Sequence, residues 1–87
     1  MIFLEMKFTV RCNKDDERIS AKTVCKIVET VQRSKSECLI TRGEKTRNAG
    51  SVLMLMSLGI QNGDTVTIKC DDKNCVDKIY KILQETK

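Results

Sequence analysis

The chain has 87 residues, of which 40% are hydrophobic and 32% are charged, and this size predicts a single domain over residues 1–87. A chain this short has room for one thin core, which excludes a deep internal active site. The net charge of +4 is spread along the whole sequence beside only three aromatic residues, so direct nucleic-acid binding is not expected.

Apolar and polar residues alternate over residues 2–10 and predict a half-buried strand. Because Glu5 and Lys7 interrupt this apolar stretch and no basic segment precedes it, it does not fit a secretory signal peptide. The sequence offers no segment long enough for membrane insertion. The lack of a secretory signal and the odd number of cysteines predict a cytoplasmic protein. A charged loop, RCNKDDER, follows the strand.

Apolar residues take up a helical spacing over residues 19–34, where Ser20 is placed to cap the helix and Lys22 to lie on its solvent face. Residues 37–48, ECLITRGEKTRN, predict a hairpin that turns at 42–44. The residues expected to face the core are Val24, Ile27, Val28 and Val31 from the helix, with Cys38 and Ile40 from the hairpin.

The stretch NAGSVLMLMSLG, residues 48–59, contains a run that is apolar on every side. A buried strand is an alternative, because so short a run has no decisive period, but leucine and methionine favour a helix from Ser51 to Leu58. Ser51 is then the N-cap, and Gly59 is the residue that ends the helix. A two-turn helix hides only about half of its side chains, so part of segment 52–56 must stay exposed, as is typical of a protein interface.

Two further elements complete the chain. Asn62-Gly63 predicts a turn, the alternation after it predicts a strand over 65–70, and the remainder is an amphipathic helix. The candidates for its cap are Asp71, Asp72 and Asn74, and its buried face carries Val76, Ile79, Tyr80 and Leu83. The resulting order, β-α-β-β-α-β-α, predicts an α+β two-layer sandwich with a four-stranded sheet and helices on one face.

Five cysteines stand at positions 12, 25, 38, 70 and 75. Their odd number and the absence of a tightly spaced pair predict free thiols in a reducing compartment. Cys25 and Cys38 fall on apolar positions, where a thiol packs as a small hydrophobic group. Without histidine or a Cys-x-x-Cys motif, the sequence predicts neither a metal site nor a cofactor.

The segment GSVLMLMSLGIQNGDTVTI, residues 50–68, together with the order of elements, resembles the HPr family of small phosphocarrier proteins of the bacterial sugar phosphotransferase system. The resemblance implies an open-faced β-sandwich with a four-stranded antiparallel sheet and three helices on one face. It implies that Ser51 matches a regulatory serine that HPr kinase phosphorylates. The apolar positions that meet the kinase and a transcriptional regulator are matched by Val52, Leu53 and Met56.

The family's phosphocarrier motif, Gly-(Leu/Ile)-His-x-Arg-Pro-Ala, is matched by RISAKTV at residues 18–24. Ser20 stands where the histidine would be, and Lys22 stands where the arginine would be. Phosphoryl shuttling needs an imidazole nitrogen, whereas a serine without an activating base is a poor nucleophile near neutral pH. We therefore expect no phosphocarrier activity and no enzyme, with Ser20 and Lys22 as a degenerate site and Ser20 as a helix cap.

The resemblance implies a regulatory HPr-like protein of carbon catabolite control, similar in type to the catabolite-repression HPr homologue, which lacks the histidine. Its expected partners are an HPr kinase-like enzyme, a catabolite-control regulator or phosphotransferase components. The alternative is an interaction or decoy module with the same fold and no phosphorylation. Gly50 favours that alternative, because the family usually has a lysine before the regulatory serine.

Overall fold

The computed structural model describes residues 4–11 and 18–84, and its elements follow the predicted order. The strands are β1 (Leu4–Thr9), β2 (Cys38–Arg42), β3 (Lys45–Asn48) and β4 (Thr65–Cys70). The helices are α1 (Ala21–Ser34), α2 (Val52–Leu58) and α3 (Lys73–Ile82). The predicted strand before residue 4, the loop at 12–17 and the predicted helix at 85–87 fall outside the described residues.

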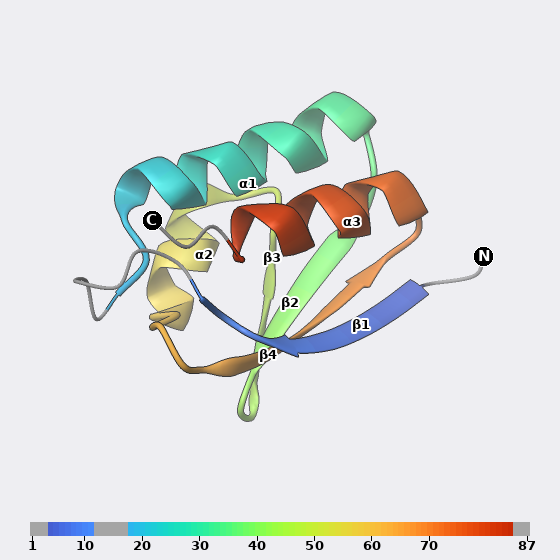
Figure 1. Cartoon of the computed structure of the whole chain (residues 1–87). Helices are drawn as coiled ribbons and strands as arrows, with labels where there is room; N and C mark the ends of the chain where they lie inside the picture. Colours follow the sequence, from blue (N-terminus) through green and yellow to red (C-terminus); the bar gives the residue numbers. More distant parts are fainter. Residues whose placement is uncertain (1–3, 12–17, 85–87) are drawn as a thin grey trace.

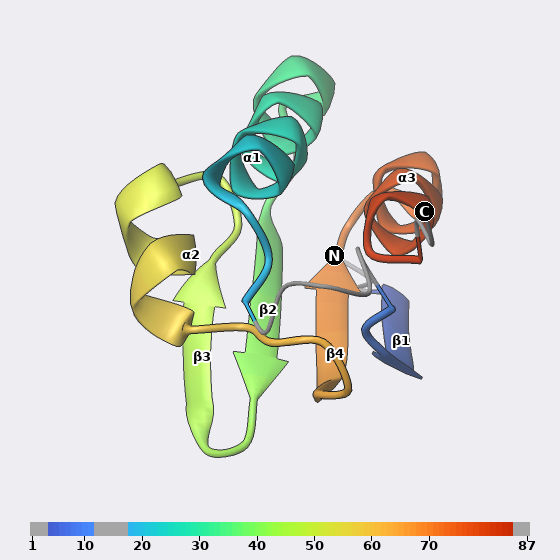
Figure 2. The same ribbon diagram turned by 60° about the vertical axis from the view of Figure 1, so that its left-hand side comes forward.

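The four strands form one antiparallel sheet in the order β1-β4-β2-β3. All three helices cover the same face of this sheet, with α2 over β3 at one edge, α3 toward β1 at the other and α1 between them (Figures 1 and 2). This arrangement confirms the predicted α+β two-layer fold. Within the described chain, β4 is the strand that pairs with both β1 and β2, so it joins the two halves of the sheet.

The core lies between the sheet and the helices, and its residues follow the predicted periodicities. The apolar stripe of α1 is buried as expected, and the inward side of β4 alternates with an outward side of threonine and lysine. Phe8 of β1 packs partly against this core. The central buried residues are Val24, Ile27, Val28, Val31, Ile40, Leu55, Leu58, Val66, Ile68, Val76, Ile79 and Leu83.

Two residues were predicted to be buried and are exposed instead. Tyr80 lies on the flank of α3 and is 38% exposed. Its ring contacts the ring of Phe8 edge-on, with the centroids 4.9 Å apart. The first turn of the same helix instead directs Cys75 toward the core. Cys25 is exposed because a residue directly after Val24 points about 100° away from the buried stripe of α1. Both predictions took a position beside the apolar stripe as part of it.

The prediction of free thiols is wrong for Cys38 and Cys70, which form a disulfide. The two residues are directly opposed across β2 and β4, with their Cα atoms 4.2 Å apart. They stand 32 positions apart in the sequence, so their spacing carries no signal of the pairing. Cys38 is buried, as predicted.

Candidate functional site at helix α2

Helix α2 buries one side and exposes apolar residues on the other. Leu55 and Leu58 are buried against the sheet and α1. Leu53 is 80% exposed, and the neighbouring Val52, Met54 and Met56 are 42%, 40% and 47% exposed. We refer to these four residues as the exposed patch. The exposure of part of segment 52–56 was predicted from the sequence, and three of the four residues are the binding positions implied by the family resemblance, whereas Met54 was not among them.

Ser51 is the N-cap of α2, as predicted. Its backbone is extended, with φ −128° and ψ 122°, and its Oγ accepts a hydrogen bond from the backbone N–H of Met54 at 3.4 Å. The Ser51 N–H donates to the carbonyl of Asn48 at 3.4 Å. The residue is half-buried, so its hydroxyl is held at the helix terminus directly beside Val52 of the exposed patch.

Gly50 is fixed by contacts on both of its backbone groups. Its N–H donates to Asn48 Oδ1 at 2.7 Å, and its carbonyl accepts from Gln32 Nε2 of α1 at 3.2 Å. A Cβ added at this position would lie 3.2 Å from Asn48 Oδ1 and 3.5 Å from Val31 Cγ1. The backbone is not left-handed here, so a side chain requires only a small shift of Asn48.

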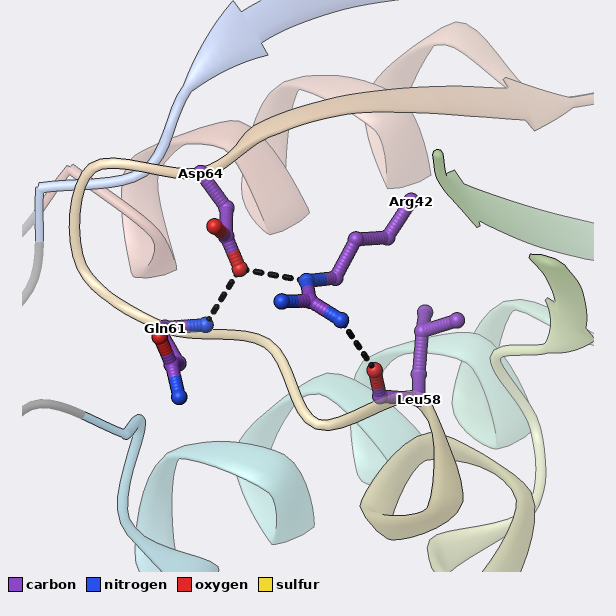
Figure 3. Close-up of polar contacts among 4 residues, drawn as sticks. All are labelled: Arg42, Leu58, Gln61 and Asp64. Atoms are coloured by element: carbon purple, nitrogen blue, oxygen red, sulfur yellow. Dashed lines mark hydrogen bonds and ion pairs between the residues drawn. The ribbon is translucent and has the colours of Figure 1, made fainter. Parts of the chain in front are cut away.

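The other end of α2 is held by Arg42, at the end of β2 (Figure 3). Its Nη1 donates to the carbonyl of Leu58 at 3.2 Å, and its Nε donates to Asp64 Oδ2 at 2.5 Å. The same carboxylate oxygen accepts from the backbone N–H of Gln61 at 2.8 Å. Because a cation at a helix C-terminus also complements the helix dipole, Arg42 fixes α2 and the following turn to the sheet. Sequence reasoning missed this pair, since its members stand 22 positions apart.

Ser20 lies at the opposite end of α2 from Ser51. The backbone N–H of Ile19 donates to the carbonyl of Ile60 at 3.1 Å, which joins the start of α1 to the segment after α2. The Ser20 Oγ accepts from the Thr23 N–H at 3.1 Å, and it also lies 3.1 Å from Thr23 Oγ1. Ser20 is therefore the predicted cap of α1. Lys22 is exposed.

One further cluster was not predicted. The sulfur atoms of Cys38, Cys70 and Cys75 lie within 4.8 Å of one another in the buried core. A Cys-x-x-Cys spacing would have indicated such a cluster, but here β2, β4 and α3 bring together cysteines that are far apart or irregularly spaced.

Comparison with known proteins decides the family. A family model described as the PTS HPr component phosphorylation site matches residues 5–85 of the chain. The chain belongs to the HPr family. No curated protein matches it significantly in sequence.

Solved HPr structures have the same fold as this HPr-family chain. HPr from Thermoanaerobacter tengcongensis superposes with a TM-score of 0.81 at 19% identity, covering 93% of this chain and 91% of that one. The phosphocarrier protein HPr of Bacillus anthracis gives 0.75 at 20% identity, covering 98% of each chain. Crh, the catabolite repression containing protein of Bacillus subtilis, gives 0.70 at 23% identity, covering 85% and 88% respectively. At these identities the likeness establishes the fold, which is the predicted open-faced β-sandwich.

In the part of this HPr-family chain that the structure describes, no helix is both long enough and apolar enough to cross a bilayer.

Proposed function

We propose that this HPr-family protein is a cytoplasmic regulator of the bacterial phosphotransferase system and carbon catabolite control, and that it does not transfer phosphoryl groups through histidine. Ser51 is its phosphorylation site, and Val52, Leu53 and Met56 bind a protein partner. The observation that carries the proposal is the exposed patch beside the half-buried Ser51 at the start of α2.

The exposed patch supports a protein partner because four large apolar side chains of one short helix lie in solvent together. Two of them are methionines, whose flexible side chains adapt to a partner's surface. The opposite side of α2 is already committed to the core through Leu55 and Leu58. The patch therefore offers apolar area for binding on the side of α2 that does not face the core.

Phosphorylation of Ser51 would add about −1.5 to −2 charges at the N-terminal end of α2. The first turn of α2 contains no acidic residue, and a helix N-terminus favours negative charge, so the helix remains intact. The result is an apolar surface with an anion at its edge. A partner that reads this state would pair an apolar pocket with arginine or lysine side chains.

The absence of phosphoryl transfer is supported by the composition and by Ser20. The chain has no histidine at any position. Ser20 stands at the start of α1 and uses its hydroxyl to accept the Thr23 N–H. A serine phosphate is a stable ester, so it would not pass a phosphoryl group onward as a phosphohistidine does.

The test is incubation with HPr kinase and ATP, followed by mass spectrometry of the wild type, Ser51→Ala and Ser57→Ala. Ser57 is a matched control because it is an exposed serine of the same helix. Phosphate on the wild type and Ser57→Ala, but not on Ser51→Ala, would support the proposal. A wild type that acquires no phosphate at Ser51 would contradict the regulatory part.

A second candidate is an interaction or decoy module that binds its partner without phosphorylation. It is favoured by Gly50, which offers no side chain for a kinase to read and whose backbone N–H and carbonyl are occupied by Asn48 and Gln32. Binding of phosphotransferase components that is equal for wild type and Ser51→Ala, but weaker for Leu53→Ala, would select this candidate.

A further inference from the structure

Three cysteine sulfurs from three different elements meet in the core. Cys38 comes from β2, Cys70 from β4 and Cys75 from the first turn of α3, and all three residues are at most 1% exposed. The Sγ atoms of Cys38 and Cys75 are 3.4 Å apart, and all three sulfur atoms lie within 4.8 Å of one another. The strand register and the start of α3 thus hold three soft ligand atoms around one point.

This spacing suits a metal ion bound by three thiolates. Sulfur ligands about 2.3 Å from an ion in a trigonal plane stand about 4 Å from one another. The Sγ of Cys75 lies 3.4 Å from the Sγ of Cys38 and within 4.8 Å of the Sγ of Cys70, so a separation of about 4 Å falls between these two distances. When the bond between Cys38 and Cys70 is reduced, side-chain rotation at these directly opposed strand residues can open their sulfurs to the same separation.

The donor set indicates which ion fits. The chain has no histidine, and among the described residues no fourth cysteine or carboxylate joins the group. Structural zinc sites use four ligands, so this set is incomplete for zinc. Thiolates are soft ligands that favour soft ions such as Cu(I). Three thiolates complete the trigonal coordination of such an ion, so the buried apolar site does not have to supply a water molecule as a further ligand.

The surroundings offer access and some compensation of charge. Cys75 lines a groove of about 560 Å³ between α1 and α3, to which the basic side chains of Lys26, Arg33 and Lys78 and the acidic side chains of Glu29 and Asp72 also contribute. The hydroxyl of Ser34, another residue that lines the groove, donates its proton to the carbonyl of Val31 at 2.9 Å. Cys75 lies in the first turn of a ten-residue helix, where backbone N–H groups favour an adjacent negative charge.

We propose that the reduced protein binds one Cu(I) ion through the thiolates of Cys38, Cys70 and Cys75. The disulfide form does not bind the ion. Reduction of the bond between Cys38 and Cys70 takes two electrons and two protons. Two equivalents of a thiol supply both and leave as one external disulfide, whereas a phosphine supplies the two electrons, takes an oxygen atom from water and leaves as its oxide while that water supplies the two protons. Binding of the ion then releases one proton from each of the three thiols.

The experiment uses the full chain with Cys12→Ser and Cys25→Ser, so that only the three clustered cysteines remain. The protein is reduced with a phosphine, kept free of oxygen and titrated with Cu(I) against a chromogenic Cu(I) chelator. We expect one Cu(I) per chain and X-ray absorption from three sulfur neighbours at about 2.3 Å. Adding Cys75→Ser removes one of the three ligands and should therefore weaken binding by more than the roughly 10–100-fold that the loss of an outer-shell contact costs.

A thermal-unfolding measurement keeps the proposal testable if Cys75→Ser fails to fold. Cu(I) should raise the Tm of the reduced three-cysteine protein and leave the Tm of its disulfide form unchanged, because a ligand stabilises only the state that binds it. Equal Cu(I) affinity with and without Cys75, nitrogen or oxygen neighbours around the ion, or tighter binding of Zn²⁺ than of Cu(I) would each overturn the proposal.

Discussion

Leu53 and Leu55 stand two positions apart in α2, yet Leu53 is 80% exposed and Leu55 is 1% exposed. Two positions rotate a side chain by about 200° around a helix, so the two leucines point in nearly opposite directions. Leu55 anchors α2 to the core, whereas Leu53 belongs to the exposed patch. The fold and the proposed binding surface are therefore carried by different residues of the same seven-residue helix.

The two leucines should respond differently to truncation. Leu55→Ala should lower the free energy of unfolding by about 2–5 kcal/mol, because it leaves a cavity in the core. Leu53→Ala should change it by less than about 0.5 kcal/mol, as is usual at exposed positions. Urea denaturation of both variants measures the difference. Similar losses for the two would show that α2 is not oriented as described.

The N-cap role of Ser51 predicts a modest stability effect that is separate from phosphorylation. Ser51→Ala should lower the free energy of unfolding by about 0.5–1 kcal/mol, whereas Ser51→Asp should retain most of the cap. Ser20→Ala should cost about 1 kcal/mol, since the Ser20 cap is shorter, at 3.1 Å against 3.4 Å. Thermal and urea unfolding test these values, and a neutral Ser20→Ala would count against the cap.

The ion pair of Arg42 and Asp64 should stabilise the turn after α2. Arg42→Met keeps the aliphatic chain but removes the hydrogen bonds to Asp64 and to the Leu58 carbonyl. We expect it to lower the free energy of unfolding by about 1–2 kcal/mol. The effect is no larger because both side chains are partly exposed, and water weakens the attraction between them. A double-mutant cycle with Asp64→Asn should give a coupling energy above about 0.5 kcal/mol. A coupling energy near zero would show that the two side chains act independently.

The sequence fails at places where the fold, not the local pattern, decides the contacts. The periodic spacing of apolar residues predicted the first and last helices and the strands at residues 4–9 and 65–70, because burial on one side of an element selects apolar residues at a regular spacing. Helix α2 has no such period and was predicted from its leucine and methionine content. Ser51 and Ser20 were identifiable as caps because a cap bonds within its own turn. Arg42 with Asp64 and the three clustered cysteines were not identifiable, since sheet pairing and the packing of α3 on the sheet bring them together from distant parts of the sequence. Tyr80 was wrongly predicted to be buried because the apolar stripe of α3 was taken to include the position next to Ile79.

Gly50 offers a direct test of kinase recognition. Gly50→Lys should change the free energy of unfolding by less than about 0.5 kcal/mol, because only the Asn48 side chain must shift. If the lysine is part of what the kinase reads, this variant should be phosphorylated on Ser51 faster than the wild type. Gly59→Ala is the contrasting control: with φ at +67° it should cost about 1 kcal/mol. Unchanged phosphorylation of Gly50→Lys would remove Gly50 as an argument for the decoy module.

Burial raises the pKa of the Cys75 thiol, an effect that Asp72 and Asp71 reinforce and that Ser34 and Lys78 oppose. The folded protein therefore keeps this proton at a pH where the unfolded chain has lost it. Stability from this group is fully present below about pH 8.5, the ordinary pKa of an unfolded thiol, and declines as the pH rises further.

Comparison of the wild type with Cys75→Ala measures this contribution. Urea denaturation of both proteins between pH 7 and 10, with the disulfide intact, should show a steeper decline for the wild type. Titrations common to both proteins cancel in the difference. Parallel pH profiles would contradict a raised pKa for the Cys75 thiol.

The strand order has a consequence for how the chain reaches its native state. β1 is first in sequence, but its partner β4 is the last strand, so their pairing closes a loop of more than half the chain. Loops of this length are entropically costly and slow to close, and the hairpin of β2 and β3 has no link to β1 until β4 enters between them. A nascent chain that ends before Thr65 contains β1 and the β2–β3 hairpin but lacks the strand that pairs with both. The complete sheet can therefore form only after β4 has been synthesised, and it then forms in one cooperative step.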